Sequence, residues 1–372
     1  MRTFKSIGAM ALILSLPVAC GDHGENNGST DGGTTDGGTT DGGTTSLQSG
    51  ESCTIEGSGF GHKDGPTLFY DDFESGAAGN QVTGWIIEGQ ADHKALYDDS
   101  HAFGADQAAL IDFPDGVWGN TMYLTDLNLD EVYVSYRVYV HDGGGTPKDG
   151  PQLKFARATS ADKDVIHGDL SIGMTYVGAF GEGSATWFNM GSADPGSFYG
   201  ESPSTDTWAR IELYLRLSTP AGQPNGERWA KMNYGGRMTY SGYPDGYFAD
   251  PFGTTGLDPS QYTGAPMVTR TTDDADKHIQ NVVMPMFTRP EQVISVWVDE
   301  VYIDNTQARV EIGDAPHWYD CMDRSPQPIV SWQDDRIVIR LNQGRLTGDA
   351  FAFVVTASGQ IIEQGRIGSW AE

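Results

Sequence analysis

Basic residues are scarce in this sequence. Of its 372 residues, 23 are Lys or Arg and 51 are Asp or Glu, so the formal net charge is −28. Proteins that bind DNA or RNA gain most of their affinity by neutralising phosphates. The charge balance therefore excludes nucleic acid as an expected partner. It also disfavours other polyanions unless a local basic groove overrides the overall field.

Cysteine is also scarce, with three residues at positions 20, 53 and 321. These separations do not match the ligand spacing of a zinc site. The N-terminus resembles an export signal, which implies that the chain folds in an oxidising compartment. Cys53 and Cys321 are therefore expected to form a disulfide. Two buried free thiols are the alternative.

Long hydrophobic runs are lacking apart from one near the N-terminus. Arg2 and Lys5 precede the run IGAMALILSLPVA, which is too short for a confident membrane span and is typical of a signal peptide over residues 1–19. The ending LPVAC resembles a bacterial lipoprotein cleavage box, with Cys20 as the lipidated residue; an ordinary cleaved signal is the alternative. A lipid on Cys20 would anchor the chain to a membrane without spanning it.

The segment that follows supports this interpretation. Residues 20–50 repeat TDGGT and contain almost nothing apolar, so we expect a disordered tether. The prediction is an outer-membrane lipoprotein on the bacterial cell surface or in the periplasm.

Helical periodicity is rare, whereas glycine is abundant at 49 residues and strand-like alternation recurs. The clearest case is residues 208–240. Arg210, Glu212 and Tyr214 alternate with apolar residues, the turn TPAGQPNG reverses the chain, and Lys231 and Asn233 share one face of the return strand. This pattern predicts a hairpin with one apolar and one polar, aromatic face.

Further strands at regular spacing predict an all-β protein with a β-sandwich over 51–322. They are expected at 67–75, 109–114, 131–145, 151–158, 169–177, 184–191 and 293–305. Residues 241–283 interrupt the pattern and are interpreted as an ordered flap over the sheet. Residues 323–372 are predicted to be a small C-terminal β unit that packs on the main domain.

Several predicted strands contribute polar residues that we expect to converge on one surface. Aromatic plates mixed with cationic donors suit sugar rings that carry hydroxyls or carboxylates. A solvated outer face with cross-strand ion pairs is the alternative. The candidates are Arg137, Tyr139, His141, Gln152, Lys154, Arg210, Glu212, Tyr214, Lys231 and Asn233.

Two hydrolytic motifs are missing. There is no Gly-x-Ser-x-Gly elbow, so a serine hydrolase is unsupported. There is no E-x-D-x-x-E run either, and Glu212 is solitary, whereas glycoside hydrolysis needs two carboxylates at a set separation.

Residues of about 66–305 resemble the concanavalin A-like jelly-roll polysaccharide lyases of the alginate and glucuronan type. The resemblance is carried by RVYVHDGGGTPKDGPQLKFA, DLSIGMTY, TWFN and the hairpin sequence. Lys154 is the nearest match to the lysine of the family's Gly-Gly-Lys-Leu-Pro segment, and Ser171 to the serine of Ser-x-Arg. Gly173 stands in place of that arginine, while Trp187 and Asn189 replace a Tyr-x-Tyr pair. Ser171, Trp187 and Asn189 are expected to bind substrate on the same surface.

The resemblance implies β-elimination from a uronate-containing polysaccharide, with no required cofactor. This reaction needs a group that neutralises the carboxylate, a base for the C5 proton and an acid for the leaving oxygen. Lys154 and Arg137 are expected to serve the first need, His141 or His167 the second, and Tyr176 or Tyr214 the third. Because family residues are missing, a non-catalytic glycan-binding or adhesion lipoprotein is the alternative.

The same family often opens with a DFE…G…W pattern and closes with a strand such as DEVYID. Here these are Asp72-Phe73-Glu74 with Trp85, and residues 299–304. The resemblance implies that the first and last strands pair, which would bring Cys53 near Cys321. It also implies a structural calcium held by Asp72, Glu74 or Asp299; solvated turn carboxylates are the alternative.

Overall fold

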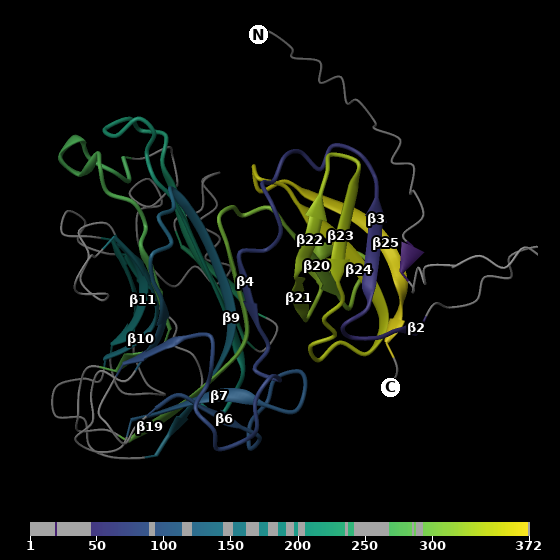
Figure 1. Ribbon diagram of the computed structural model, residues 1–372, viewed down its shortest axis with the longest axis horizontal. Helices are drawn as coiled ribbons and strands as arrows, with labels where there is room; N and C mark the ends of the chain where they lie inside the picture. Colours follow the sequence, from purple (N-terminus) through teal and green to yellow (C-terminus); the bar gives the residue numbers. More distant parts are fainter. Residues whose placement is uncertain are drawn as a thin grey trace, which may run out of the picture.

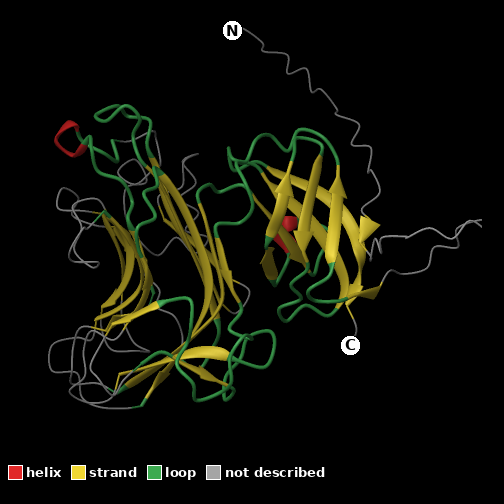
Figure 2. Ribbon diagram, in the orientation of Figure 1, coloured by secondary structure: helices red, strands yellow, loops and turns green. Residues whose placement is uncertain are grey.

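The protein, described here from a computed structural model, is built almost entirely of β-strands (Figure 2). In the described part of the chain, no helix is long and apolar enough to cross a membrane. The structure describes residues 19–20, 46–88, 94–113, 121–143, 152–160, 171–177, 185–190, 197–199, 205–234, 237–241, 268–284, 286–287 and 293–370. Only the backbone is described at 19, 142, 152–155, 171–177, 185–190, 197–199, 228, 230–234, 237–241 and 286–287. Most of the predicted flap, at 242–267, and His167 lie outside the described residues.

The main domain is a β-sandwich of two antiparallel sheets (Figure 1). The β9 sheet has the order β16-β15-β14-β9-β19-β7-β6, with β4 paired to β19. Its strands are β4 (Phe69–Asp71), β6 (Leu96–Asp98), β7 (Ala108–Phe113), β9 (Glu131–Asp142), β14 (Ala209–Arg216), β15 (Glu227–Tyr234), β16 (Arg237–Ser241) and β19 (Ile294–Asp304).

The β10 sheet has the order β13-β12-β11-β10-β17-β8-β5, with β18 paired to β10. Its strands are β5 (Ile86–Glu88), β8 (Thr121–Leu124), β10 (Gln152–Thr159), β11 (Ser171–Val177), β12 (Ala185–Met190), β13 (Ser197–Tyr199), β17 (Asn281–Val283) and β18 (Met286–Phe287).

The core of the sandwich follows from strand alternation. Val134 and Val138 of β9 and Ile211 of β14 pack in one buried cluster with Ala156 and Ala158 of β10. Because successive residues of a strand point to opposite faces, the residues between them lie on the outer faces. The outer faces of the two sheets therefore point away from each other.

The predicted hairpin at 208–240 is confirmed. Strands β14 and β15 pair antiparallel, with Glu212 opposite Lys231 and Arg210 opposite Asn233. The predicted pairing of the first and last strands is also confirmed, since Tyr70 of β4 lies opposite Tyr302 of β19.

A β-bulge interrupts β19 between Asp299 and Tyr302, where its register against β9 shifts. Glu300 has φ +48°, a left-handed conformation that non-glycine residues seldom adopt. The bulge turns Val301 and Ile303 into the core and leaves Tyr302 on the outer face. A regular strand would have done the reverse.

The C-terminal β unit is a second, smaller sandwich beside the β9 sheet (Figure 1). Its sheets have the orders β2-β25-β24-β20-β21 and β1-β3-β23-β22. Its strands are β1 (Ala19–Cys20), β2 (Ser46–Leu47), β3 (Ser52–Glu56), β20 (Arg309–Gly313), β21 (Arg324–Gln327), β22 (Ile329–Trp332), β23 (Arg336–Arg340), β24 (Gly348–Val355) and β25 (Ile361–Trp370).

The observed boundaries differ from the predicted 51–322 and 323–372. Strand β3 pairs with β23, and β20 pairs with β24, so both ends of the predicted main domain belong to the smaller unit. Ile55 and Val310 are completely buried in its core with Ile337. The physical reason is that β3 and β20 each supply a pairing partner and apolar side chains that residues 323–372 lack by themselves.

The predicted disulfide between Cys53 and Cys321 is wrong. Cys53 lies on β3 and is bonded to Cys20 on the neighbouring β1, while Cys321 is a buried free thiol. Cys321 packs instead with Trp318 and Phe353 in a separate cluster. Burial raises the pKa of the Cys321 thiol to about 11, which leaves it protonated and unreactive at neutral pH.

The disulfide bond of Cys20 affects the predicted lipid anchor. A sulfur in this disulfide cannot also carry a lipid thioether, so the bond and the predicted lipidation exclude each other. We expect a non-reducing digest of the purified chain, analysed by mass spectrometry, to contain one species that joins the Cys20 and Cys53 peptides. Cys321 should become alkylated only after denaturation. A lipid-modified Cys20 peptide with a free Cys53 would contradict the disulfide.

Candidate functional site

The residues predicted to share one surface fall on two sheets. Arg137, Tyr139, His141, Arg210, Glu212, Tyr214, Lys231 and Asn233 lie on the β9 sheet, while Gln152, Lys154, Ser171, Tyr176, Trp187 and Asn189 lie on the β10 sheet. The outer faces of these sheets point in opposite directions. The prediction that these residues converge on one surface is therefore wrong. Alternation shows which face of a strand a residue lies on, but it does not show which sheet the strand joins.

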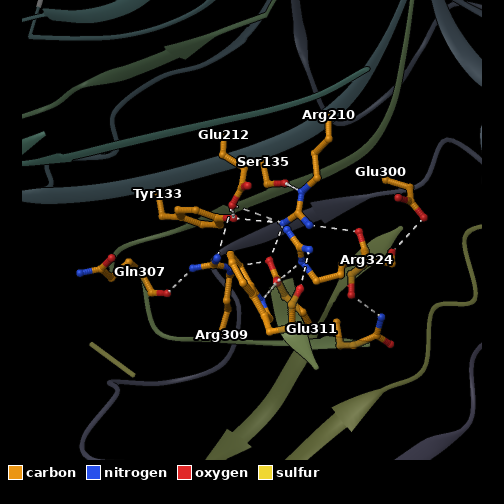
Figure 3. Close-up of polar contacts among 12 residues, drawn as sticks. Tyr133, Ser135, Arg210, Glu212, Glu300, Gln307, Arg309, Glu311 and Arg324 are labelled. Carbon is orange, nitrogen blue, oxygen red and sulfur yellow. Dashed lines mark hydrogen bonds and ion pairs between the residues drawn. The ribbon is translucent and has the colours of Figure 1, made fainter. Parts of the chain in front are cut away.

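The C-terminal unit covers the outer face of the β9 sheet around Arg210 and Glu212, and a buried ionic network fills the contact (Figure 3). At its centre, Glu311 of β20 accepts hydrogen bonds from three guanidinium groups: Arg210 Nη2 at 2.6 Å, Arg309 Nε at 2.9 Å and Arg324 Nε at 3.2 Å. Trp318 Nε1 donates a fourth at 2.7 Å. All five side chains are buried.

Glu212 is a second acceptor in the same network. Its Oε1 accepts from the Tyr133 hydroxyl at 2.5 Å and from Arg309 Nη2 at 3.3 Å. Arg210, from the adjacent row of β14, also donates to the Ser135 hydroxyl at 2.9 Å. Arg210 and Glu212, predicted to bind substrate, are 2% exposed and are used within the protein.

The protonation of Glu311 depends on this arrangement. Burial acts to raise the pKa of its carboxyl, but the opposed charges of Arg210, Arg309 and Arg324 outweigh burial and hold the pKa well below the ordinary 4.5. Glu311 is therefore ionised in the folded protein at neutral pH, and the network is charged throughout.

Arg137 extends the contact along β9. It pairs with Glu300 Oε2 at 3.2 Å and with Asp323, and it donates to the Arg324 carbonyl at 2.7 Å. Its guanidinium carbon also lies 4.0 Å from the centre of the Phe103 ring. Arg137 is 6% exposed, so the prediction that it neutralises a substrate carboxylate does not fit its surroundings.

Tyr214 is fully buried on the same face. Its hydroxyl donates to Glu131 at 2.8 Å, and its ring lies 5.5 Å from that of Trp229. Burial is the largest of the effects that raise the pKa of Tyr214, and the charges of Glu131 and Glu227 add to it. A buried, internally bonded hydroxyl is not positioned to protonate a leaving group, so the role predicted for Tyr214 as catalytic acid is not supported.

Tyr139 and His141 lie farther along β9, beyond the network. His141 Nδ1 is 2.7 Å from Asp206 Oδ1, and the Tyr139 hydroxyl is 3.4 Å from the same atom. The ring of Tyr139 also packs with Trp208 and Trp297 at 5.6 Å. These residues remain accessible but are on the opposite side of the sandwich from Lys154.

The acidic residues predicted to bind calcium each have amide donors of their own. Glu74 accepts from the backbone N–H groups of Asp106 and Gln107, at 3.0 and 2.9 Å. Asp299 is 1% exposed and accepts from the N–H groups of Phe103 and Glu300. Within the described ranges no group of three His, Cys, Asp or Glu side chains could hold a metal ion. Asp72, Glu74 and Asp299 therefore do not form a shared site, and calcium binding stays a prediction.

On the β10 sheet, the strand register aligns most of the predicted residues on one face. Lys154 lies opposite Thr175, and Thr175 lies opposite Trp187. Directly opposed positions share a face of a sheet. Gln152, two positions before Lys154, lies opposite Val177 in the adjacent row. This face is opposite to the one that carries the core residue Ala156.

A neighbouring row adds a residue that the sequence analysis missed. Arg157 lies opposite Gly173, and Gly173 lies opposite Asn189. Gly173 is the position at which the resemblance implies an arginine. Arg157 lies one strand away from it but is buried, with 8% exposure. Ser171 belongs to the same face, opposite Thr159.

The reason for missing Arg157 is a bulge in β10. Residues 154 and 157 are an odd number of positions apart, so regular alternation puts them on opposite faces. The register of β10 against β11 shifts between Lys154 and Ala156, which returns Arg157 to the face of Lys154. We define the glycan face as the outer face of the β10 sheet around Lys154, Arg157, Trp187 and Asn189.

Tyr176 does not share the glycan face. It lies opposite Leu153 and Thr186, in the row between those of Thr175 and Val177. Neither predicted tyrosine acid is therefore on the same face as Lys154.

Comparison with known proteins finds similar structures but no similar sequences. The sequence matches no protein-family model and no curated protein. Solved structures similar to this chain include the alginate lyase Aly36B, with a TM-score of 0.43, 12% identity, and coverage of 64% of this chain and 97% of that one. An endo-β-1,4-glucuronan lyase from the fungus Trichoderma reesei has a TM-score of 0.39 and 12% identity, covering 64% and 96%. Lectin II from Ulex europaeus has a TM-score of 0.33 and 8% identity, covering 64% and 99%.

The ionic network predicts acid sensitivity. Because the pKa of Glu311 is lower in the folded than in the unfolded chain, its ionisation stabilises the fold above about pH 4.5, and this contribution is lost as the pH falls through the folded pKa. In Glu311→Gln, the unfolding free energy measured by urea titration should be lower at neutral pH, and the deficit should shrink in acid. A deficit that is the same at every pH would contradict the role assigned to the charge.

The burial of Tyr214 predicts a purely structural variant. Tyr214→Phe removes one hydrogen bond to a carboxylate, so stability should fall by about 1–3 kcal/mol in thermal or urea unfolding. Retention on polyuronate affinity gels should not change. Loss of glycan retention in a folded Tyr214→Phe protein would restore Tyr214 to the site.

Proposed function

We propose that the glycan face binds a uronate-containing polysaccharide. The observation that carries the proposal is the register of β10, β11 and β12, which aligns Lys154, Arg157, Trp187 and Asn189 on one face. A lysine neutralises a carboxylate, and a tryptophan offers an apolar plate to a sugar ring. Arg157 is 8% exposed, so Lys154 is the cation assigned to the ligand. The outer face of the β9 sheet is taken up by the C-terminal unit around Arg210 and Glu311, which supports assigning the ligand to the β10 sheet.

A lyase that cleaves such a glycan by β-elimination is the second candidate. It is favoured by the strand order, because the Lys154, Ser171-x-Gly173 and Trp187-x-Asn189 segments come from the consecutive neighbours β10, β11 and β12. Lys154 would neutralise the carboxylate and so acidify the C5 proton. Of the predicted bases and acids in the described part of the chain, His141 and Tyr214 belong to the other sheet and Tyr176 to the other face; His167 lies outside it. Binding without cleavage therefore has the better support.

We also propose that the chain is exported and held at the bacterial surface. The signal-like residues 1–19 and the TDGGT repeats support export and a tether. A lipid on Cys20 requires its thiol to be free of the Cys20–Cys53 bond, so a lipid-anchored form would have Cys53 reduced or paired elsewhere.

The proposal is tested with Lys154→Ala. Affinity electrophoresis of the full-length chain through alginate, glucuronan and pectate should show retardation by at least one of them. Loss of one charge-assisted contact should weaken the apparent affinity by about tenfold or more. The matched control is Lys231→Ala, which removes a lysine from the β9 sheet.

The same samples distinguish binding from cleavage. Ultraviolet absorbance of an unsaturated uronate product, rising with time and absent in Lys154→Ala, would establish the lyase. Retardation without absorbance supports binding alone. Retardation that survives in Lys154→Ala but is lost in Lys231→Ala would contradict the assignment to the β10 sheet.

A further inference from the structure

A cavity of about 340 Å³ opens where β9 begins and β14 ends, away from the glycan face. It is lined by Asp130, Glu131, Arg216, Leu217, Thr219 and Asn225. Pockets for small molecules typically measure about 300–1,000 Å³, so this cavity suits one small ligand or one unit of a larger one. We call it the Arg216 pocket.

The wall of the Arg216 pocket is pre-formed by the turn after β14. The Thr219 N–H donates to Asn225 Oδ1 at 3.0 Å, and Asn225 Nδ2 donates back to the Thr219 carbonyl at 2.6 Å. Behind the turn, Arg270 is 5% exposed and donates to the Ser218 carbonyl and the Thr219 hydroxyl, both at 3.1 Å. Because this wall is already ordered, binding a ligand costs less conformational entropy.

Charges around the pocket have partners of opposite sign. Arg216 lies opposite Glu227 in the strand register, and its Nη2 is 3.0 Å from Glu227 Oε2. Asp130 Oδ1 accepts from Arg270 Nη1 at 2.9 Å and lies 2.8 Å from His278 Nδ1. A simple cation or anion would have to compete with these pairs, so a neutral ligand fits better.

The Glu131 carboxyl offers hydrogen-bond acceptors to a ligand and is not assigned as a binding site for a cation. Its Oε1 already accepts from the Tyr214 hydroxyl at 2.8 Å and from the Gln307 N–H at 3.3 Å, and burial raises the pKa of the carboxyl. Acceptors on Glu131 and donors on Arg216 together match sugar hydroxyls, each of which both donates and accepts. Leu217 adds an apolar contact for the ring.

We propose that the Arg216 pocket binds one neutral sugar unit through hydrogen bonds from its hydroxyl groups to Asp130, Glu131 and Arg216. This second site is on the opposite sheet from the glycan face and does not depend on the function proposed there. It borders the segment between β19 and β20, since Gln307 contacts both Glu131 and the Ala357 carbonyl.

The test uses saturation-transfer NMR on the full-length chain with the methyl glycosides of glucose, galactose, mannose and xylose. At least one should bind, and Arg216→Ala should weaken it by about tenfold or more, because hydrogen bonds from a charged donor are lost. Arg216→Lys should weaken it less, since one charged donor remains. Arg366→Ala is the matched control: Arg366 has the same 41% side-chain exposure and pairs with Asp349 at 2.8 Å, but lies in the C-terminal unit.

Glucuronate, glycine and Ca²⁺ are titrated in parallel to test the ligand class. Tighter binding of any of these than of the neutral glycosides would overturn the proposal, as would the absence of glycoside binding or full binding in Arg216→Ala. If thermal melting shows that Arg216→Ala is unfolded, Glu131→Gln replaces it with the same expected loss. Polyuronate gels with Lys154→Ala report on the glycan face alone, so failure of one site is distinguishable from failure of the other.

Discussion

The structure depends on one buried carboxylate, Glu311, surrounded by the guanidinium groups of Arg210, Arg309 and Arg324. A buried charge without partners is costly, and three cations without their anion would be costlier still. The network is therefore satisfied only when β14 of the main domain and β20 and β21 of the C-terminal unit lie against each other. The two sandwiches are consequently held together, and the part of the outer face of the β9 sheet around Arg210 and Glu212 is closed to ligands.

Two β-bulges decide which charged residues reach the outer faces. The bulge in β19 places Glu300 where it can pair with Arg137 and accept from Ser325. The bulge in β10 brings Arg157 to the face of Lys154. In each case one extra residue reverses the alternation that follows it. The first bulge strengthens the contact between the units, and the second places Arg157 on the same face of β10 as Lys154.

The proposed anionic ligand has to be reconciled with an acidic chain. The formal net charge of −28 disfavours polyanions in general, but Lys154 and Arg157 lie on neighbouring rows of one face. Many of the remaining arginines are committed to internal carboxylates, as Arg309 is to Glu311. In the proposed function, affinity for a uronate would come from Lys154, while the overall field limits nonspecific binding of other polyanions.

The sequence by itself determined the all-β class, the hairpin of β14 and β15, the apolar and polar faces of β9, and a separate unit at the C-terminus. Each of these follows from alternation between neighbours along the chain. The tertiary structure alone decided that Arg210 and Glu212 are buried, that Cys53 bonds Cys20, and that Arg157 joins Lys154. The physical reason is the sequence separation of the contacts involved. Alternation between neighbours shows which residues share a face. What packs on that face is decided by long-range contacts, such as that of Arg210 with Glu311, 101 positions away.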